Sequence, residues 1–377
     1  MLVMATGRTC PGQPSLLETR LPSFLSAKVV GALAGYWGFA STIAAVNTMT
    51  GIGSFKGLPI EDPDALQDVE VPMPELRPHD VLVRVQAVSV NPADVKRRGS
   101  LPPSETPAIL GFDAAGVVEA VGPAVTTLAV GDDVWYAGDI SRQGSNAQFH
   151  AVDERIAARK PASLSHADAA ALPLTTITAW ETLFERFGLG AESRGDLLVL
   201  GAAGGVGSVM IQLAKALTGV RVIATASRDD SRQWATGMGA DVVINHHDLR
   251  DQALDVAPDG IDYLFSPHSK DNVETYAAIM RPFGHITAID EPPGLDLLPL
   301  KEKSIAWHWE LMFTRPLFGF DTQAQQRLLT EAASLVDRGV LRSTLTNSIA
   351  DFTAVGLREA HRQVESGRMI GKVVVHR

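Results

Sequence analysis

The most regular hydrophobic pattern of the chain lies in its middle third. Leu197–Leu200 form an apolar run without polar alternation, which is typical of a parallel strand buried on both faces. The run ends at a glycine-rich turn, and apolar residues then repeat at helical spacing up to Leu217. This order predicts a phosphate-binding turn, because small residues admit the backbone to a pyrophosphate and a helix N-terminus offers unpaired N–H groups. The residues predicted to hold the phosphates are Ala203, Gly204, Gly205, Val206 and Gly207. An ordinary tight turn is the alternative.

Helical and strand patterns alternate after residue 160. Two helical stretches, His166–Ala171 and Thr175–Phe187, precede the apolar runs. The predicted strands are Leu197–Leu200, Val220–Ala226, Asp241–Ile244, Tyr263–Ser266, His285–Ile289 and Ser304–Leu311. Such alternation predicts an α/β fold with a doubly wound parallel sheet, here a Rossmann-type dinucleotide-binding domain over residues 161–311. The second strand follows the glycine turn at the distance that favours dinucleotide binding over a simple turn.

Short β-like runs separated by Pro and Gly fill the region from Asp68 to His150. They are Val81–Val90, Gly116–Val121, Asp133–Tyr136 and Ala147–Val152, and they predict a compact, partly open β-barrel. Polar residues gather on two stretches between them, Asn91–Gly99 and Leu110–Gly116, which we expect to be loops that carry the chemistry.

The C-terminal pattern predicts a helix over Gln323–Arg338 and a second helix that Asp351 opens as N-cap. A terminal strand, Lys372–His376, follows. We expect this tail to fold back onto the barrel. The catalytic domain would then be discontinuous, with segments 28–160 and 312–377.

The N-terminal residues 1–27 are rich in Pro, Ser and Gly and predict a poorly ordered extension. Val29–Ala45 is apolar, but it contains Gly, Ser and Thr and is shorter than the ~20 residues that usually span a bilayer. We expect no membrane segment there. A strand near Ala32–Trp37 and a long loop over 38–56 are the preferred interpretation.

The amino-acid composition of the chain limits the kinds of ligand and partner that it can bind. The net charge of −10 over 377 residues opposes a nucleic-acid surface, because phosphate binding requires clustered Lys and Arg. Cys10 is the single cysteine, so neither an internal disulfide nor a cysteine-based metal site can form. This cysteine usage fits a cytoplasmic protein.

The end of the second strand of the Rossmann pattern indicates which nucleotide binds. An acidic residue there would hold the ribose of NAD, whereas a basic residue accepts the 2′-phosphate of NADP. Ser227 and Arg228 occupy this place, and they predict NADP(H). The alternative is that Arg228 only solvates the loop before Asp229 and Asp230.

Together these pieces resemble the medium-chain dehydrogenase/reductase superfamily, from about residue 30 onward. The likeness is greatest to zinc-type alcohol dehydrogenase-like proteins, close to the quinone and enone oxidoreductases. The resemblance implies a GroES-like barrel domain, adds Thr178 to the cofactor-binding residues and suggests a homodimer that pairs through the strand near Ser304–Leu311. The shared motifs are Asn91-Pro92-x-Asp94-x-Lys96, Gly111-x-Asp113-x-Ala115-Gly116, Thr178-Ala179-Trp180 and Ala203-Gly204-Gly205-Val206-Gly207. Three further motifs resemble the zinc-type alcohol dehydrogenase-like proteins in particular: Tyr136–Ile140, Gly144–Ala147 and His308–Arg315.

The same resemblance argues against zinc. Members that use zinc carry Cys where this chain has Asn91, a His-Glu pair at Phe112-Asp113, and Cys near Leu174. Catalytic zinc needs three N, S or O ligands in one arrangement, which these residues cannot supply. We therefore expect no metal site.

Related reductases often place Tyr or Lys at the position of Lys96, which implies a zinc-free reduction of quinones or α,β-unsaturated carbonyls. The Lys96 ammonium would stabilise the substrate oxygen, and surface basicity is its alternative role. The resemblance implies that Asn91 orients the cofactor. The alternative role of Asn91 is to cap the loop. Asp94 is expected to hold Lys96 and the loop in place, and Tyr136 is a reserve proton donor or a core tyrosine. Two alternative functions are a zinc-type alcohol dehydrogenase and a non-catalytic NADPH-binding protein.

Overall fold

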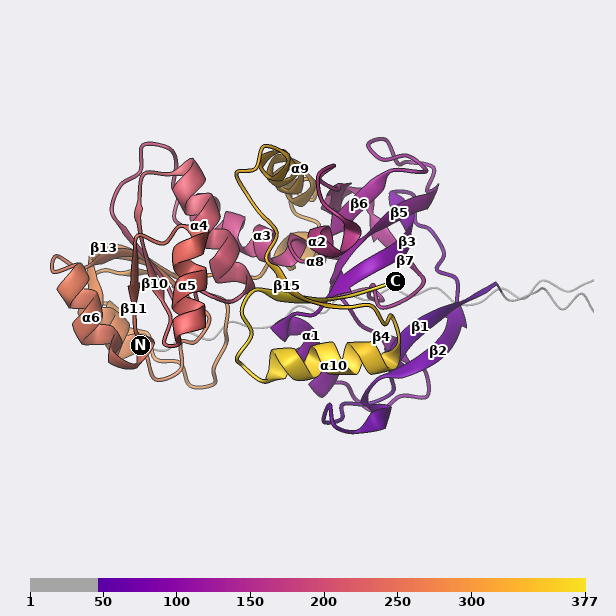
Figure 1. Ribbon diagram of the computed structural model, residues 1–377, viewed down its shortest axis with the longest axis horizontal. Coiled ribbons are helices and arrows are strands. Elements are labelled where there is room, and N and C mark those ends of the chain that lie inside the picture. The colour runs from indigo at the N-terminus through magenta and orange to yellow at the C-terminus, as the bar shows by residue number, and fades with distance from the viewer. Residues whose placement is uncertain (1–46) are drawn as a thin grey trace, which may run out of the picture. The chain divides into compact units, whose positions relative to one another are not determined.

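The computed structural model of the protein describes residues 47–377 (Figure 1). Three expectations therefore lie outside the described residues: the extension over 1–27, the strand near Ala32–Trp37 and the apolar stretch Val29–Ala45. Among the described helices, none is both long enough and apolar enough to cross a bilayer.

A six-stranded parallel sheet forms the centre of the Rossmann domain, in the order β11-β10-β9-β12-β13-β14. This is the doubly wound arrangement that the alternating pattern predicts. The strands are β9 (Asp196–Val199), β10 (Arg221–Thr225), β11 (Val242–Ile244), β12 (Ile261–Ser266), β13 (Met280–Ala288) and β14 (Ala306–Trp309).

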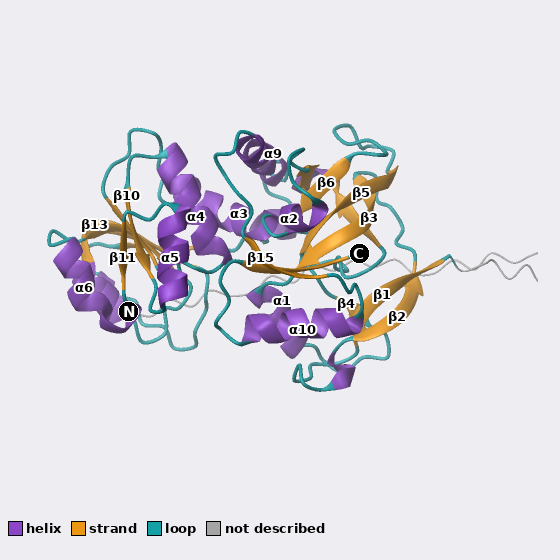
Figure 2. Ribbon diagram, in the orientation of Figure 1, coloured by secondary structure: helices purple, strands orange, loops and turns teal. Residues whose placement is uncertain are grey.

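Helices cover both faces of this sheet, which explains why its strands lack polar alternation. Leu197 and Val199 on β9 pack in the cluster that contains residues of α4 and α5, whereas Leu198 packs in the cluster of α6 and α7. All three side chains are fully buried. The helices are α4 (Gly205–Leu217), α5 (Asp229–Met238), α6 (Leu249–Val256) and α7 (Val273–Ile279) (Figure 2).

A second sheet of seven strands forms the GroES-like domain, with β15-β16-β3-β5-β6-β8 as its path and β7 paired to β3. A three-stranded sheet, β2-β1-β4, lies beside it (Figure 1). β16 pairs antiparallel with β3, with Val374 opposite Ser89, so the tail folds back onto the barrel as expected. The strands are β1 (Thr48–Ser54), β2 (Gln67–Pro72), β3 (Asp80–Ser89), β4 (Ala108–Ile109), β5 (Asp113–Val121), β6 (Asp133–Tyr136), β7 (Phe149–Asp153), β8 (Ala157–Arg159), β15 (Leu345–Ile349) and β16 (Lys372–His376).

The remaining helices connect or cover the two sheets. α3 packs against both α4 and α9, and α10 packs on β16 and α1. They are α1 (Pro92–Gly99), α2 (His166–Ala170), α3 (Pro173–Trp180), α8 (Thr314–Phe318), α9 (Ala324–Asp337) and α10 (Ala354–Glu365), with a π-helix at Glu181–Arg186 and 3₁₀ turns at Pro63–Ala65, Glu154–Ile156, His246–Asp248 and Leu298–Leu300.

Besides the stretch Leu110–Gly116, of which Asp113–Gly116 belong to β5 and not to a loop, the structure corrects three local predictions. The stretch Asn91–Gly99 is not a loop, because Pro92 is favourable at the first helical position and Asp94 accepts a hydrogen bond from the Asn91 backbone N–H at 2.8 Å. Asp351 is not the N-cap of α10; the Thr353 hydroxyl takes that place by accepting from Val355 and Gly356.

The third correction concerns residues 48–54, which form β1 where a loop was expected. The glycines of β1 made this strand difficult to recognise from the sequence. Gly53 is required there, because a Cβ on it would lie 2.7 Å from Pro107 Cβ.

Candidate active site

The glycine turn between β9 and α4 has the backbone that a phosphate site requires. Gly201 has φ 63°, and Gly204 caps α4 with extended backbone. A Cβ on Gly207 would lie 2.6 Å from the Cα of Ala202, so the first helical turn lies directly on the preceding loop. The unpaired N–H groups of a helix start are then available to an anion. The predicted residues Ala203–Gly207 thus fit a pyrophosphate.

The GroES-like domain also contacts this turn. Gly371 N donates to Ala203 O at 2.8 Å, and Gly204 forms a parallel bridge with Gly371. A Cβ on Gly205 would lie 2.7 Å from Lys372 Cδ and 2.9 Å from Thr175 Cγ2. Glycine at position 205 is therefore needed for packing inside the protein, and not only for approach to a cofactor.

Arg228 lies at the expected place, between the end of β10 at Thr225 and the start of α5 at Asp229. Its side chain is 41% exposed; Nε contacts Asp230 Oδ1 at 3.2 Å, and Nη2 donates to Arg368 O at 3.0 Å. Ser227 beside it is partly buried. A cation at the end of this strand fits a 2′-phosphate.

Thr178 is less available than Arg228. It is 5% exposed, and its hydroxyl donates to Leu174 O at 2.9 Å within α3. Its role in cofactor binding stays a prediction.

A buried polar cluster lies beside the glycine turn, made by Asn91, Asp113 and Lys372. The Lys372 ammonium donates to Val90 O at 3.0 Å and to Asn91 Oδ1, and it lies 3.5 Å from Asp113 Oδ2. Asn91 Nδ2 donates to Asp113 Oδ2 at 2.9 Å, and Leu174 N donates to Asp113 Oδ1 at 2.7 Å. Burial lowers the pKa of Lys372, and the charge of Asp113 opposes that shift.

The cluster engages the side chain of Asn91, whose role toward the cofactor stays a prediction. Its side chain is fully enclosed, and both ends of its amide are used inside the protein. An ammonium has three donors, and the three oxygens around Lys372 use them. The polar atoms of both side chains are thus engaged inside the protein, at the start of α1.

Asp94 is buried next to this cluster. Its carboxylate accepts from the Asn91 backbone N–H at 2.8 Å. Desolvation by burial raises the pKa of Asp94 to about 7, against the hydrogen bond from Asn91 and the charge of Lys372. The expectation that Asp94 holds Lys96 is wrong, because the Lys96 ammonium has another partner; Asp94 holds the start of α1.

That partner is Glu291, which follows β13 in the Rossmann domain. Lys96 Nζ lies 3.2 Å from Glu291 Oε1, and the side chains are 61% and 75% exposed. A pair this exposed contributes little to stability. Lys96 is therefore a cation at the junction of the two domains that can exchange Glu291 for another partner.

The residues at the positions of zinc ligands do not fit zinc. Phe112 is buried with its ring centroid 4.6 Å from that of Phe313, and Leu174 and the fully engaged Asn91 occupy the other two places. Across residues 47–377, no group of three His, Cys, Asp or Glu side chains is arranged to hold a metal ion. The tetrahedral set that catalytic zinc needs is thus missing from these positions.

Tyr136 is a core tyrosine rather than an available proton donor. It is fully buried, and its hydroxyl lies 3.0 Å from His150 Nδ1. Burial raises the pKa of Tyr136 far above its ordinary value.

Lys372 and Glu291 were not among the predicted site residues. For Lys372 a signal existed: a lysine opens the apolar strand Lys372–His376, and buried lysines are usually paired. Glu291 gave no such signal, since it lies in a loop nearly 200 residues from Lys96.

Comparison with known proteins agrees with this architecture. The family model of the alcohol dehydrogenase GroES-like domain matches residues 77–162. The family model of the zinc-binding dehydrogenase matches residues 205–309. A zinc-type alcohol dehydrogenase-like protein of Staphylococcus epidermidis is 38% identical over 336 residues, which are 87% of this chain and 99% of that protein. A crystal structure from Rhizobium etli, of a candidate zinc-dependent alcohol dehydrogenase, has a TM-score of 0.84 at 45% identity and covers 88% of this chain and 98% of that one.

Two plant reductases are also similar. The 2-methylene-furan-3-one reductase of Solanum lycopersicum is 31% identical over 320 residues, 81% of this chain and 74% of that protein. The chloroplastic NADPH-dependent alkenal/one oxidoreductase of Arabidopsis thaliana is 37% identical over 205 residues, 51% of each chain.

The two domains and the family matches show that the chain is an oxidoreductase. The chain belongs to the medium-chain dehydrogenase/reductase superfamily, among its zinc-type alcohol dehydrogenase-like proteins.

Proposed function

We propose that the protein is an NADPH-dependent reductase of α,β-unsaturated carbonyls or quinones that works without zinc. The observation that carries this proposal is the exposed Lys96 ammonium at the domain junction, in a site whose metal-ligand positions hold Asn91, Phe112 and Leu174. The similarity to two plant reductases of such substrates supports the same class.

The cofactor would be held along the ends of β9 and β10. The helix start at Gly204–Gly207 would bind the pyrophosphate, and Arg228 with Ser227 would bind the 2′-phosphate. When bound, NADPH supplies the hydride. The preference for NADPH over NADH rests on Arg228 and on the absence of an acidic residue at the end of β10.

Lys96 is the proposed catalytic residue. Negative charge develops on the substrate oxygen during reduction, and an ammonium that donates to this oxygen stabilises it. Glu291 must release Lys96 for this contact, which costs little because both groups are in water. Lys96 or a water molecule then supplies the proton that completes the reduced product.

The buried cluster positions this lysine. Lys372 and Asp113 fix the amide of Asn91, and Asn91 begins α1, the helix that carries Lys96. One turn of helix separates the two residues, so a displaced helix start would displace the ammonium.

The test is NADPH consumption by the purified full-length protein with a panel of enones, quinones and simple alcohols, with NADH in parallel. We expect turnover of enones or quinones, and a loss of about 10²–10³-fold in kcat on Lys96→Ala, the typical effect of losing one oxyanion donor. Arg159→Gln, an exposed residue of β8 paired with Asp132, is the matched control.

Other outcomes would support other functions. Activity only with alcohols, together with stoichiometric zinc and inhibition by chelators, would indicate a zinc-type alcohol dehydrogenase. NADPH binding without turnover of any substrate would indicate a binding protein. Full turnover by Lys96→Ala with normal NADPH affinity would remove Lys96 from the mechanism.

A further inference from the structure

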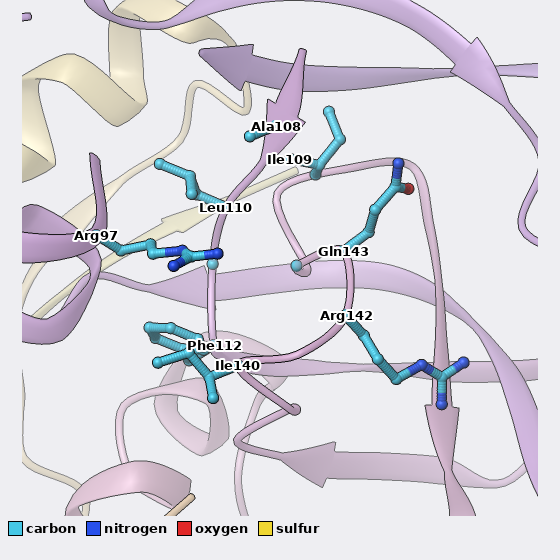
Figure 3. Close-up of a pocket in the computed structure, with 10 residues that line it drawn as sticks. Arg97, Ala108, Ile109, Leu110, Phe112, Ile140, Arg142 and Gln143 are labelled. Atoms are coloured by element: carbon cyan, nitrogen blue, oxygen red, sulfur yellow. The ribbon is translucent and has the colours of Figure 1, made fainter. Parts of the chain in front are cut away.

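A small pocket lies on the GroES-like domain beside α1. Its volume is about 120 Å³. Arg97 and Phe112 both line it (Figure 3). Arg97 follows Lys96 on α1, and Phe112 directly precedes Asp113, the first residue of β5. The residues that line it are Arg97, Ala108, Ile109, Leu110, Gly111, Phe112, Ile140, Arg142, Gln143 and Gly144.

The side chains of the pocket wall are apolar except for Gln143 and two arginines. Arg142 is already neutralised, because its guanidinium donates to both carboxylate oxygens of Asp80 at 2.8 and 2.6 Å. Arg97 forms no ion pair or side-chain hydrogen bond with any residue of the described chain, and it extends from α1 across the pocket between Leu110 and Phe112 (Figure 3). The pocket thus combines a mostly apolar wall with one guanidinium that no residue of the described chain compensates.

We infer that this pocket binds a carboxylate of the substrate through Arg97, so that the preferred substrates are short α,β-unsaturated carbonyl compounds that carry an acid group. This inference rests on the proposed function. It assigns a substrate class to the site, and it makes Arg97 the residue that selects it.

The chemistry of the wall fits such an acid. A guanidinium presents a planar pair of donors that match the two oxygens of a carboxylate. Leu110, Phe112 and Ile140 would contact the carbons next to the acid. A cavity of ~150 Å³ holds a benzene molecule, so 120 Å³ admits only a short arm of the substrate.

The charge of the whole molecule makes a local cation necessary. At a net charge of −10, the protein repels anions at long range. An anionic substrate therefore requires a specific positive group at its site, and Arg97, the residue after Lys96 on α1, provides one.

The experiment compares a short 4-oxo-2-enoate with its methyl ester, using the purified full-length protein and NADPH. We expect the kcat/KM for the acid to exceed that for the ester, and Arg97→Gln to lower the acid-to-ester ratio about tenfold or more, the usual effect of a hydrogen bond to a charged group. Arg159→Gln should leave the ratio as it is. An acid-to-ester ratio at or below one, or a ratio that Arg97→Gln does not change, would overturn the inference.

A binding measurement tests the role of the pocket independently of the reductase activity. Calorimetric titration of the saturated 4-oxoalkanoate into the NADP⁺-loaded protein should show binding that Arg97→Gln weakens about tenfold. If no enone is reduced but this acid binds through Arg97, the proposed function fails and the pocket assignment stands. Equal affinity in wild type and Arg97→Gln would refute the assignment whether or not enones are reduced.

Discussion

The methylene chain of Lys372 lies across Gly205. A Cβ built on Gly205 would come within 2.7 Å of Lys372 Cδ, while the ammonium end of Lys372 is held by Val90 and Asn91. The lysine cannot swing away without losing these hydrogen bonds. The phosphate-binding turn and the start of α1 are therefore joined through one side chain.

Gly205→Ala should weaken this junction. The added methyl group would press on Lys372 and on the buried Thr175, and overpacking of this kind costs about 1–3 kcal/mol. We expect a lower melting temperature and weaker NADPH binding. Gly99→Ala is the matched control, because a Cβ there meets no atom within 4 Å among the described residues. Equal behaviour of the two variants would contradict the packing role of Gly205.

Lys372→Met should destabilise the protein by about 3–5 kcal/mol, because it leaves the buried Asp113 carboxylate without its cation. Urea unfolding measures the change. The double variant Lys372→Met/Asp113→Asn should lose less than the sum of the two single variants, since it removes both charges together. Strict additivity would show that the two groups are not coupled.

The titration of Asp94 predicts a pH dependence of stability. Its pKa is raised from 3.8 to about 7 in the folded protein, so the folded state prefers the protonated acid. Below about pH 3 both states are mostly protonated and the group has little effect. As pH rises toward 7, the unfolded state ionises first, and the free energy of unfolding falls by up to roughly 4 kcal/mol.

Asp94→Asn lacks this titration. The stability of the variant relative to wild type should therefore increase between pH 4 and 7 and then level off. Chemical denaturation across this pH range gives the comparison. A difference that stays flat from pH 4 to 8 would mean that the carboxyl of Asp94 ionises normally in the fold.

Arg228→Ala should raise the KM for NADPH about tenfold or more and leave the KM for NADH nearly unchanged, because only NADPH carries the 2′-phosphate. Steady-state kinetics with both nucleotides measures this. Arg281→Ala removes an exposed arginine that pairs with Asp262 and serves as control. An equal rise in KM for both nucleotides would mean that Arg228 stabilises the fold and does not bind the 2′-phosphate.

The parallel sheet could be predicted from the sequence because burial on both faces leaves a local mark, seen in Leu197–Val199. The position of Arg228 followed from the same periodicity. The cluster around Lys372 could not be predicted this way, since Asn91 and Lys372 are 281 positions apart and meet only through the pairing of β3 with β16. Lys96 was identified from a sequence motif, but its pairing with Glu291 depends on how the two domains pack together.

The place of β16 in the chain also has a consequence for synthesis. This strand is made after every other described element, yet it pairs with β3, one of the first, and it supplies Lys372 to the start of α1. A nascent chain that lacks residues 371–376 would therefore carry a Rossmann domain next to a barrel whose central strand is missing one neighbour. Contacts over such a separation form slowly. On the ribosome the nucleotide-binding half can therefore fold before the barrel, which is complete only once β16 has been made.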